Sequence, residues 1–162
     1  MEPPSRSSYR ALPSVRGPVD AARQRSAERL ALPRISWDSW LAFLAPLALY
    51  LRTLAPTIYN LDSAEFTTAA YTGGLVRATG YPLYLLVGRL WSRLPIGDVG
   101  FRMNLLSAVC GALTLALTYR VLRRIGVGGW AAFGALGLLA TSVYYWGLSL
   151  IAEVYTPHTA LM

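Results

Sequence analysis

The sequence predicts an all-α fold, a polytopic membrane helical bundle, and three observations lead to this prediction. Hydrophobic residues make up 54% of the 162 residues, and charged residues make up only 14%. A soluble domain averages about 25% charged residues. The charged residues are also clustered, so that long stretches from Trp37 onward carry almost none. This pattern is typical of a chain whose helices lie in lipid.

The first 36 residues differ from the rest in composition. They contain seven Arg against three acidic residues, several Pro and few apolar side chains. Such a segment cannot bury enough apolar surface to fold, so we expect residues 1–36 to be a disordered basic tail. Because Arg-rich flanks stay on the cytoplasmic side of a membrane, the sequence predicts a cytoplasmic N-terminus and a multi-pass protein of the plasma membrane.

Residues 37–162 contain three long apolar stretches. We expect them to be membrane spans at about 37–59, 104–122 and 127–151, since a span needs about 20 residues. Thr156-Pro157 predicts the start of a further helix, with Thr156 as N-cap and Pro157 at the first helical position. The expected number of membrane helices is therefore three to four.

The net charge of +7 comes entirely from Arg. These residues flank the apolar stretches and do not line one helix face, so nucleic acid is not an expected partner. The single cysteine, Cys110, cannot form an internal disulfide, and we expect it to be a packed thiol.

Residues 60–103 form the predicted outer loop, with helices lying in the plane of the membrane. One helix should begin near Asp62 and stop at Gly73-Gly74. The apolar stretch 82–94 is short for a span, and two arrangements are open. If it lies in the outer interface, the Arg residues that follow the second span are cytoplasmic and the acids of the loop are outside. If it crosses, those Arg residues are outside, against the positive-inside tendency.

Three acidic residues are the candidate catalytic residues. Asp62 and Glu65 are three residues apart and so share a helix face. They could form a capping box, or they could bind a divalent cation or orient an acceptor nucleophile. If a metal is bound, Asp62 and Glu65 are its expected ligands. Glu153 follows the third span, either as an ordinary interfacial acid or as a third acid of the same outer pocket.

Four further residues are candidates for substrate binding. Guanidinium groups bind phosphate oxygens bidentately, so Arg77 and Arg102 could hold a phosphate, although both could also reach lipid headgroups. Tyr81 could stack on a sugar or lie at the interface. His158 is the sole histidine of the chain, and it could be a polar contact or a ligand.

Four segments in order resemble one family of multi-pass bacterial proteins. The segments are Asn60–Phe66, Gly74–Tyr84, Arg102–Ala108 and Ala152–Tyr155. The family is related to eukaryotic membrane protein O-mannosyltransferases, which have the C-type (GT-C) glycosyltransferase fold. The resemblance covers residues 37–162. The family often has His-Pro before its Gly-Tyr-Pro segment, where this chain has Arg77-Ala78.

The resemblance implies transfer of a sugar such as mannose from a polyprenyl-phosphate donor to a protein or other acceptor on the outer face. It places the essential acid of the first outer loop at Asp62, with Glu65 beside it, and the acid of the next outer loop at Glu153. A lipid-linked sugar phosphate, membrane lipids and an acceptor protein or glycan are the implied partners.

Two hypotheses about function remain open from the sequence. In the first, the chain is an N-terminal part of such a GT-C enzyme and is inactive by itself, because about three spans cannot enclose a lipid-phosphate pocket. In the second, it is a non-catalytic membrane module that serves in assembly or transport, and its acids are helix caps and interface residues.

Overall fold

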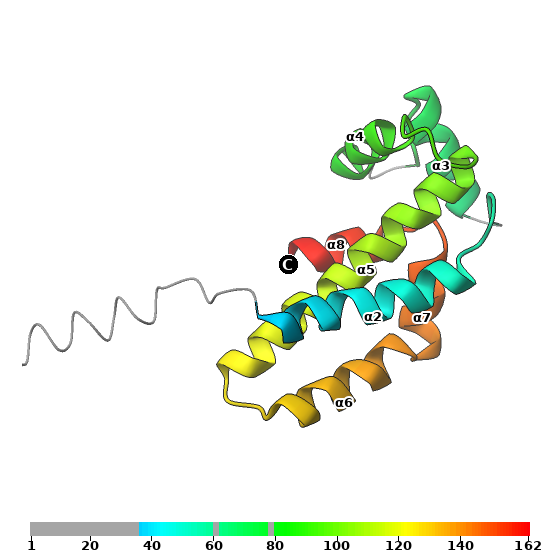
Figure 1. The fold of residues 1–162 in the computed structure, drawn as a ribbon. Helices are drawn as coiled ribbons and strands as arrows, with labels where there is room; N and C mark the ends of the chain where they lie inside the picture. Colours follow the sequence, from blue (N-terminus) through cyan, green and yellow to red (C-terminus); the bar gives the residue numbers. More distant parts are fainter. Residues whose placement is uncertain (1–35, 60–61, 78–79) are drawn as a thin grey trace, which may run out of the picture. The chain divides into compact units, whose positions relative to one another are not determined.

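The computed structural model describes residues 36–59, 62–77 and 80–162, and every regular element in these ranges is a helix (Figure 1). The helices are α2 (Trp37–Thr53), α3 (Asp62–Thr72), α4 (Pro82–Trp91), α5 (Val99–Arg124), α6 (Gly129–Ala140), α7 (Val143–Leu150) and α8 (Tyr155–Leu161). The all-α prediction is confirmed for the described residues. The predicted disordered tail lies outside them, apart from Ser36.

Helix α5 is the central element, because it contacts each of the other six helices of the described ranges. It begins where Asp98 accepts a hydrogen bond from the backbone N–H of Phe101 at 2.7 Å, the arrangement of an N-cap. Its 26 residues make it about 39 Å long. That length exceeds the roughly 30 Å hydrocarbon core of a bilayer.

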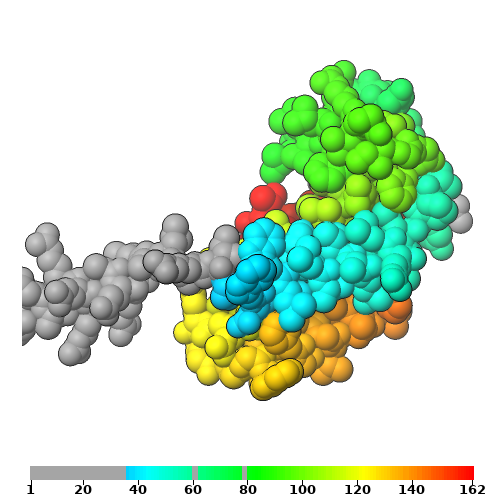
Figure 2. Space-filling model, in the orientation of Figure 1, coloured from blue at the N-terminus to red at the C-terminus, as the bar shows by residue number. Residues whose placement is uncertain are grey.

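Helix α2 runs antiparallel to α5. Near the end of α2, the Asn104 side-chain amide of α5 donates to the carbonyls of Ala55 and Thr57, both at 2.9 Å. The first half of α2 and the last part of α5 meet in one core through Ala42 and Tyr119. Helices α2 to α8 together are called the helical unit below. Figure 2 shows α2 lying across one face of it, between α6 and the residues of α3 and α4.

The third predicted span is two helices and not one. Helices α6 and α7 meet at a bend of 66°. The break leaves backbone carbonyls without a partner in the helix. The buried Tyr50 hydroxyl of α2 donates a hydrogen bond to one of them, the carbonyl of Ala140, at 3.1 Å. The helix within the predicted span over 127–151 is therefore interrupted at Thr141–Ser142, and the span itself stays a prediction. The start of the last helix also differs, because α8 begins at Tyr155 with Val154 as its N-cap residue.

Within the described ranges, α5 is long and apolar enough to cross a membrane, and α6 with α7 forms a second candidate if the bent pair is one span. The described ranges thus contain one or two candidate spans, and the predicted three to four are not shown. Helix α2 has 17 residues and is about 26 Å long. It is shorter than the predicted span 37–59, because the chain leaves the helix at Leu54.

Helix α4 buries the face that carries Tyr84 and Gly88, and it leaves an apolar stripe exposed on the opposite face. Tyr84 and Gly88 are buried, and Gly88 is so close to Met103 of α5 that a Cβ would lie 2.8 Å from its methyl group. The opposite side exposes leucines, with Leu86 68% and Leu90 70% exposed. Ten residues span about 15 Å, so this helix is too short to cross a bilayer.

Candidate functional site

The candidate site is built at the end of the helical unit where α5 begins. There α3, α4, the first half of α5 and the segment before α8 share one hydrophobic core. Its buried residues include Phe66, Tyr84, Met103, Leu106 and Ala152. This core holds the two acid-bearing segments of the sequence, 62–65 and 153, in fixed positions beside the start of α5.

Helix α3 carries its two acids in its first turn, where negative charge interacts favourably with the helix dipole. The helix ends at Thr72, and Gly73 follows it with a φ of +76°. The N–H groups of Gly73 and Gly74 both donate to the carbonyl of Ala69, at 2.9 and 3.1 Å. A left-handed glycine after the last helical residue is a common helix stop. The predicted stop is confirmed, and the turn brings Arg77 back beside the start of α3.

Asp62, Glu65 and Arg77 form a compact group that we call the acid–arginine cluster. The Nη2 of Arg77 donates to Asp62 Oδ1 at 2.5 Å and to Glu65 Oε2 at 2.6 Å. The Nε of Arg77 also donates to Glu65 Oε2 at 3.0 Å, and its backbone N–H donates to Glu65 Oε1 at 3.0 Å. Both oxygens of Glu65 therefore accept hydrogen bonds from Arg77, and the structure, which describes Asp62 and Glu65, shows no hydrogen bond between them of the kind a capping box requires.

The cluster is exposed to solvent, with side-chain exposures of 48% for Asp62, 35% for Glu65 and 62% for Arg77. The hydrogen bonds from Arg77 hold the pKa of the Glu65 carboxyl below its usual value. The same bonds raise the pKa of the Arg77 guanidinium. Both partners are consequently ionised at neutral pH.

Glu153 is the third acid, and it is buried where Asp62 and Glu65 are not. Its backbone is fixed by Ser107 of α5, whose Oγ lies 3.3 Å from the Glu153 nitrogen and 3.4 Å from its carbonyl oxygen. Burial raises the pKa of the Glu153 carboxyl and repulsion from Asp62 raises it further, while a hydrogen bond from the Val154 backbone and the charge of Arg77 lower it. Glu153 thus lies within the electrostatic field of the acid–arginine cluster.

Within the described ranges, Arg77 is the one predicted substrate-binding residue whose side chain forms hydrogen bonds with Asp62 and Glu65. The guanidinium of Arg102 donates to the carbonyls of Ser92, Ile96 and Gly97 at 2.5, 2.9 and 2.9 Å, and so it supports the turn between α4 and α5. Tyr81 has a φ of 38°, and its ring packs edge-on against Phe66 with centroids 5.4 Å apart. His158 is exposed on α8.

Ser107 is the residue of this region that the sequence reasoning did not single out. Its hydroxyl joins the first half of α5 to the Glu153 backbone. A serine inside an apolar helix often marks a contact between helices, and this signal could have identified it.

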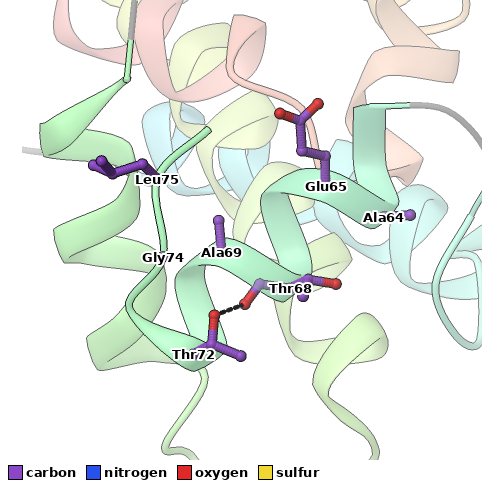
Figure 3. Close-up of a pocket in the computed structure, with 7 residues that line it drawn as sticks. All are labelled: Ala64, Glu65, Thr68, Ala69, Thr72, Gly74 and Leu75. Atoms are coloured by element: carbon purple, nitrogen blue, oxygen red, sulfur yellow. Dashed lines mark hydrogen bonds between the residues drawn. The ribbon is translucent and has the colours of Figure 1, made fainter. Parts of the chain in front are cut away.

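A shallow hollow of about 410 Å³ lies along the side of α3 (Figure 3). Its lining is made of small side chains and one acid: Ala64, Glu65, Thr68, Ala69, Thr72, Gly74 and Leu75. Glu65 is the one residue that the hollow shares with the acid–arginine cluster. Opposite Glu65, the Thr72 hydroxyl is bonded to the Thr68 carbonyl at 2.8 Å.

The described ranges contain no group of three or more His, Cys, Asp or Glu side chains placed to hold a metal ion. Asp62 and Glu65, the predicted ligands of a divalent cation, are both bonded to Arg77. In the structure, both carboxylates are therefore paired with the guanidinium group of Arg77.

Comparison with known proteins gives two results that agree. The family described as the protein O-mannosyl-transferase TMEM260 N-terminal domain matches residues 62–162. Protein O-mannosyl-transferase TMEM260 from Mus musculus is 32% identical over 115 residues, which cover 70% of this chain and 16% of the mouse protein. The chain thus corresponds to a small part of that relative's length. No solved structure matches it.

Proposed function

The chain belongs to the family of the protein O-mannosyl-transferase TMEM260 N-terminal domain, and from this premise we propose that it works in a membrane glycosyltransferase with the GT-C fold. The donor is a polyprenyl-phosphate sugar, with mannose as the sugar. The acceptor is a hydroxyl group of a protein or glycan on the outer face of the membrane.

One observation carries this proposal: two segments far apart in sequence bring Asp62, Glu65 and Glu153 to the same end of the helical unit, with Arg77 among them. Sugar transfer to a hydroxyl needs a base for the hydroxyl proton and positive charge for the departing phosphate. Asp62 and Arg77 are groups of these two kinds, and both are exposed to an incoming substrate.

In the proposed reaction the acceptor oxygen attacks the anomeric carbon of the sugar while Asp62 takes the hydroxyl proton. The bond from the anomeric carbon to the phosphate oxygen breaks, and the phosphate leaves with its electron pair. Arg77 stabilises the negative charge of the phosphate. Glu65 holds Arg77 in place, and Glu153 completes the acidic pocket.

The remaining predicted residues keep supporting roles in this proposal. Arg102 shapes the turn between α4 and α5, and Tyr81 and His158 are contacts for the sugar or the acceptor. Helices α5, α2 and the α6–α7 pair cross the membrane, α4 lies in the outer interface, and the N-terminus is cytoplasmic.

The substitution Asp62→Asn tests the proposal. It keeps the shape of the side chain and removes the base, so we expect transfer of labelled mannose from a polyprenyl-phosphate donor to fall by about 100-fold or more. The assay uses membranes that carry the natural protein. Asp98→Asn is the matched control, because Asn also caps a helix well; its activity should stay close to that of the unchanged protein.

Unchanged transfer in Asp62→Asn would refute the assignment of Asp62 as the base. The alternative of a non-catalytic membrane module for assembly or transport would then be favoured, since the acid–arginine cluster satisfies its own charges without a substrate.

A further inference from the structure

The hydrogen bonds of Arg77 are divided unequally between its two acidic partners. Glu65 accepts three of them, from the backbone N–H, from Nε and from Nη2. Asp62 accepts one, from the same Nη2. The Nη1 atom of Arg77 makes no hydrogen bond with any residue that the structure describes. One edge of the guanidinium is thus bound to Glu65, and the other is only partly used.

This asymmetry makes Asp62 the weaker partner. A carboxylate that binds both the side chain and the backbone N–H of an arginine fixes the guanidinium in position, whereas a single exposed ion pair contributes about 0–1 kcal/mol. An exposed phosphate could take the bidentate position along Nη1 and Nη2, which a guanidinium offers in suitable geometry. It would then displace Asp62 without breaking the bonds of Nε and the backbone to Glu65.

We propose that Arg77 is an anion receptor that exchanges Asp62 for a phosphate group, while Glu65 is the positioning residue that keeps the guanidinium in place. No proton or covalent bond moves in this exchange. The inference rests on the proposed function in one respect: the phosphate is that of the sugar donor. Donor binding then frees Asp62 from its ion pair, so that the base becomes available only after the donor is bound.

The exchange makes a prediction that a general charge effect does not make. If the acids acted only by their negative charge, neutralising either one would strengthen anion binding. In the proposed exchange, loss of Asp62 removes a competitor and strengthens binding, whereas loss of Glu65 removes the support of Arg77 and weakens binding. The two neighbouring acids therefore have effects of opposite sign.

The experiment follows the Nε–Hε NMR signals of the full 162-residue chain, labelled with ¹⁵N-arginine in detergent micelles. The signal of Arg77 is assigned by its loss in Arg77→Lys. Inorganic phosphate and a short-chain prenyl phosphate are titrated separately. In Asp62→Asn we expect the apparent Kd to fall about two- to fivefold, and in Glu65→Gln to rise about tenfold. Asp98→Asn should leave the Kd unchanged.

The Arg102 signal reports on folding, because its Nε is bonded to the Ile96 carbonyl at 2.9 Å. If this signal moves in Glu65→Gln, the titration is repeated with Glu65→Asp, which shortens the support and should also weaken binding. Tighter binding or an unchanged Kd in the Glu65 variants would overturn the exchange, as would an Arg77 signal that responds to neither phosphate.

The source of the phosphate is tested by comparing probes. Tighter binding of the prenyl phosphate than of inorganic phosphate supports a lipid-linked donor, and equal binding supports a receptor for the phosphate group alone. A response only to phosphatidylglycerol in the micelles would assign Arg77 to membrane headgroups and overturn the proposal. Since no sugar transfer is measured, the exchange can hold even if Asp62 proves not to be the catalytic base.

Discussion

The carboxyl groups of the candidate site are placed in two different environments. Glu65 lies in solvent with Arg77 bound to both of its oxygens, and the pKa of its carboxyl is lowered. Glu153 is buried near the negative charge of Asp62, and the pKa of its carboxyl is raised. Environments that separate the pKa values of neighbouring acids are typical of acid–base sites. Glu153 is consequently the better suited of the two to hold a proton.

The raised pKa of Glu153 predicts a pH effect on stability. The folded chain binds this proton more tightly than the unfolded chain, so the contribution of Glu153 to stability falls as pH rises above its ordinary pKa of 4.5. Glu153→Gln removes this loss, so at pH 7 we expect this variant to be more stable than the unchanged protein. Unfolding in detergent at pH 4 to 8 measures the difference from the unchanged protein. A difference that does not grow with pH would contradict the prediction.

The sequence allowed the acids to be predicted, but not their partners. The spacing of Asp62 and Glu65 and the position of Glu153 after an apolar stretch were visible in the chain. The bonds of Arg77 depend on a turn through a left-handed glycine, Gly73, which fixes where residue 77 returns. The role of Arg102 as a phosphate ligand stays a prediction. The sequence did not indicate that its guanidinium binds three carbonyls, because that contact is set by the loop path.

At the scale of elements, close approach at the start of α5 holds the site end together. Gly100 faces the segment that follows α2, and a Cβ there would overlap the backbone of Thr57 and Ile58. Because both obstacles are main-chain atoms, neither can be moved aside by a change of rotamer. The segment 54–59 therefore depends on a glycine at this position for its path over α5.

Gly100→Ala should destabilise the folded chain by about 1–3 kcal/mol through overpacking. Gly134→Ala in α6 is the matched control, because a Cβ there would meet no atom within 4 Å. In a helix interior that change should stabilise by about 0.5–1 kcal/mol. Thermal unfolding of both variants in detergent measures the two effects. Equal stability of the two variants would show that the contact at Gly100 does not constrain the fold.

Helix existence was more predictable than helix continuity. Apolar composition indicated each of the long helices, because lipid and core both favour runs of apolar side chains. The break between α6 and α7 carries no Pro or Gly at Thr141–Ser142, and the chain gives no local sign of it. The carbonyl of Ala140 is bonded to Tyr50, a residue 90 positions away, so this bend depends on tertiary contacts that periodicity does not report.

At the scale of the whole helical unit, the antiparallel packing of α2 and α5 places the acids of the candidate site far from the last turn of α5. The acid–arginine cluster, Asp98 and Glu153 lie at the end where α5 begins, since Asp98 is bonded to Thr57 and Glu153 to Ser107. Arg123 and Arg124 lie in the last turn of α5, at its other end. In the proposed topology this Arg-bearing end of α5 faces the cytoplasm, which the positive-inside tendency favours.

The separation predicts opposite sides of a membrane for the two ends of α5. Single cysteines are placed at Ile96 and Ile125, which are 46% and 71% exposed, in a chain whose own Cys110 is replaced by Ala. A membrane-impermeant maleimide should label Ile96→Cys in intact cells and Ile125→Cys only after permeabilisation, because α5 is about 39 Å long. The cysteine-free chain controls for background. Labelling of both positions from one side would mean that α5 does not cross, and the acids would then have no defined outer face on which to meet a lipid-linked donor.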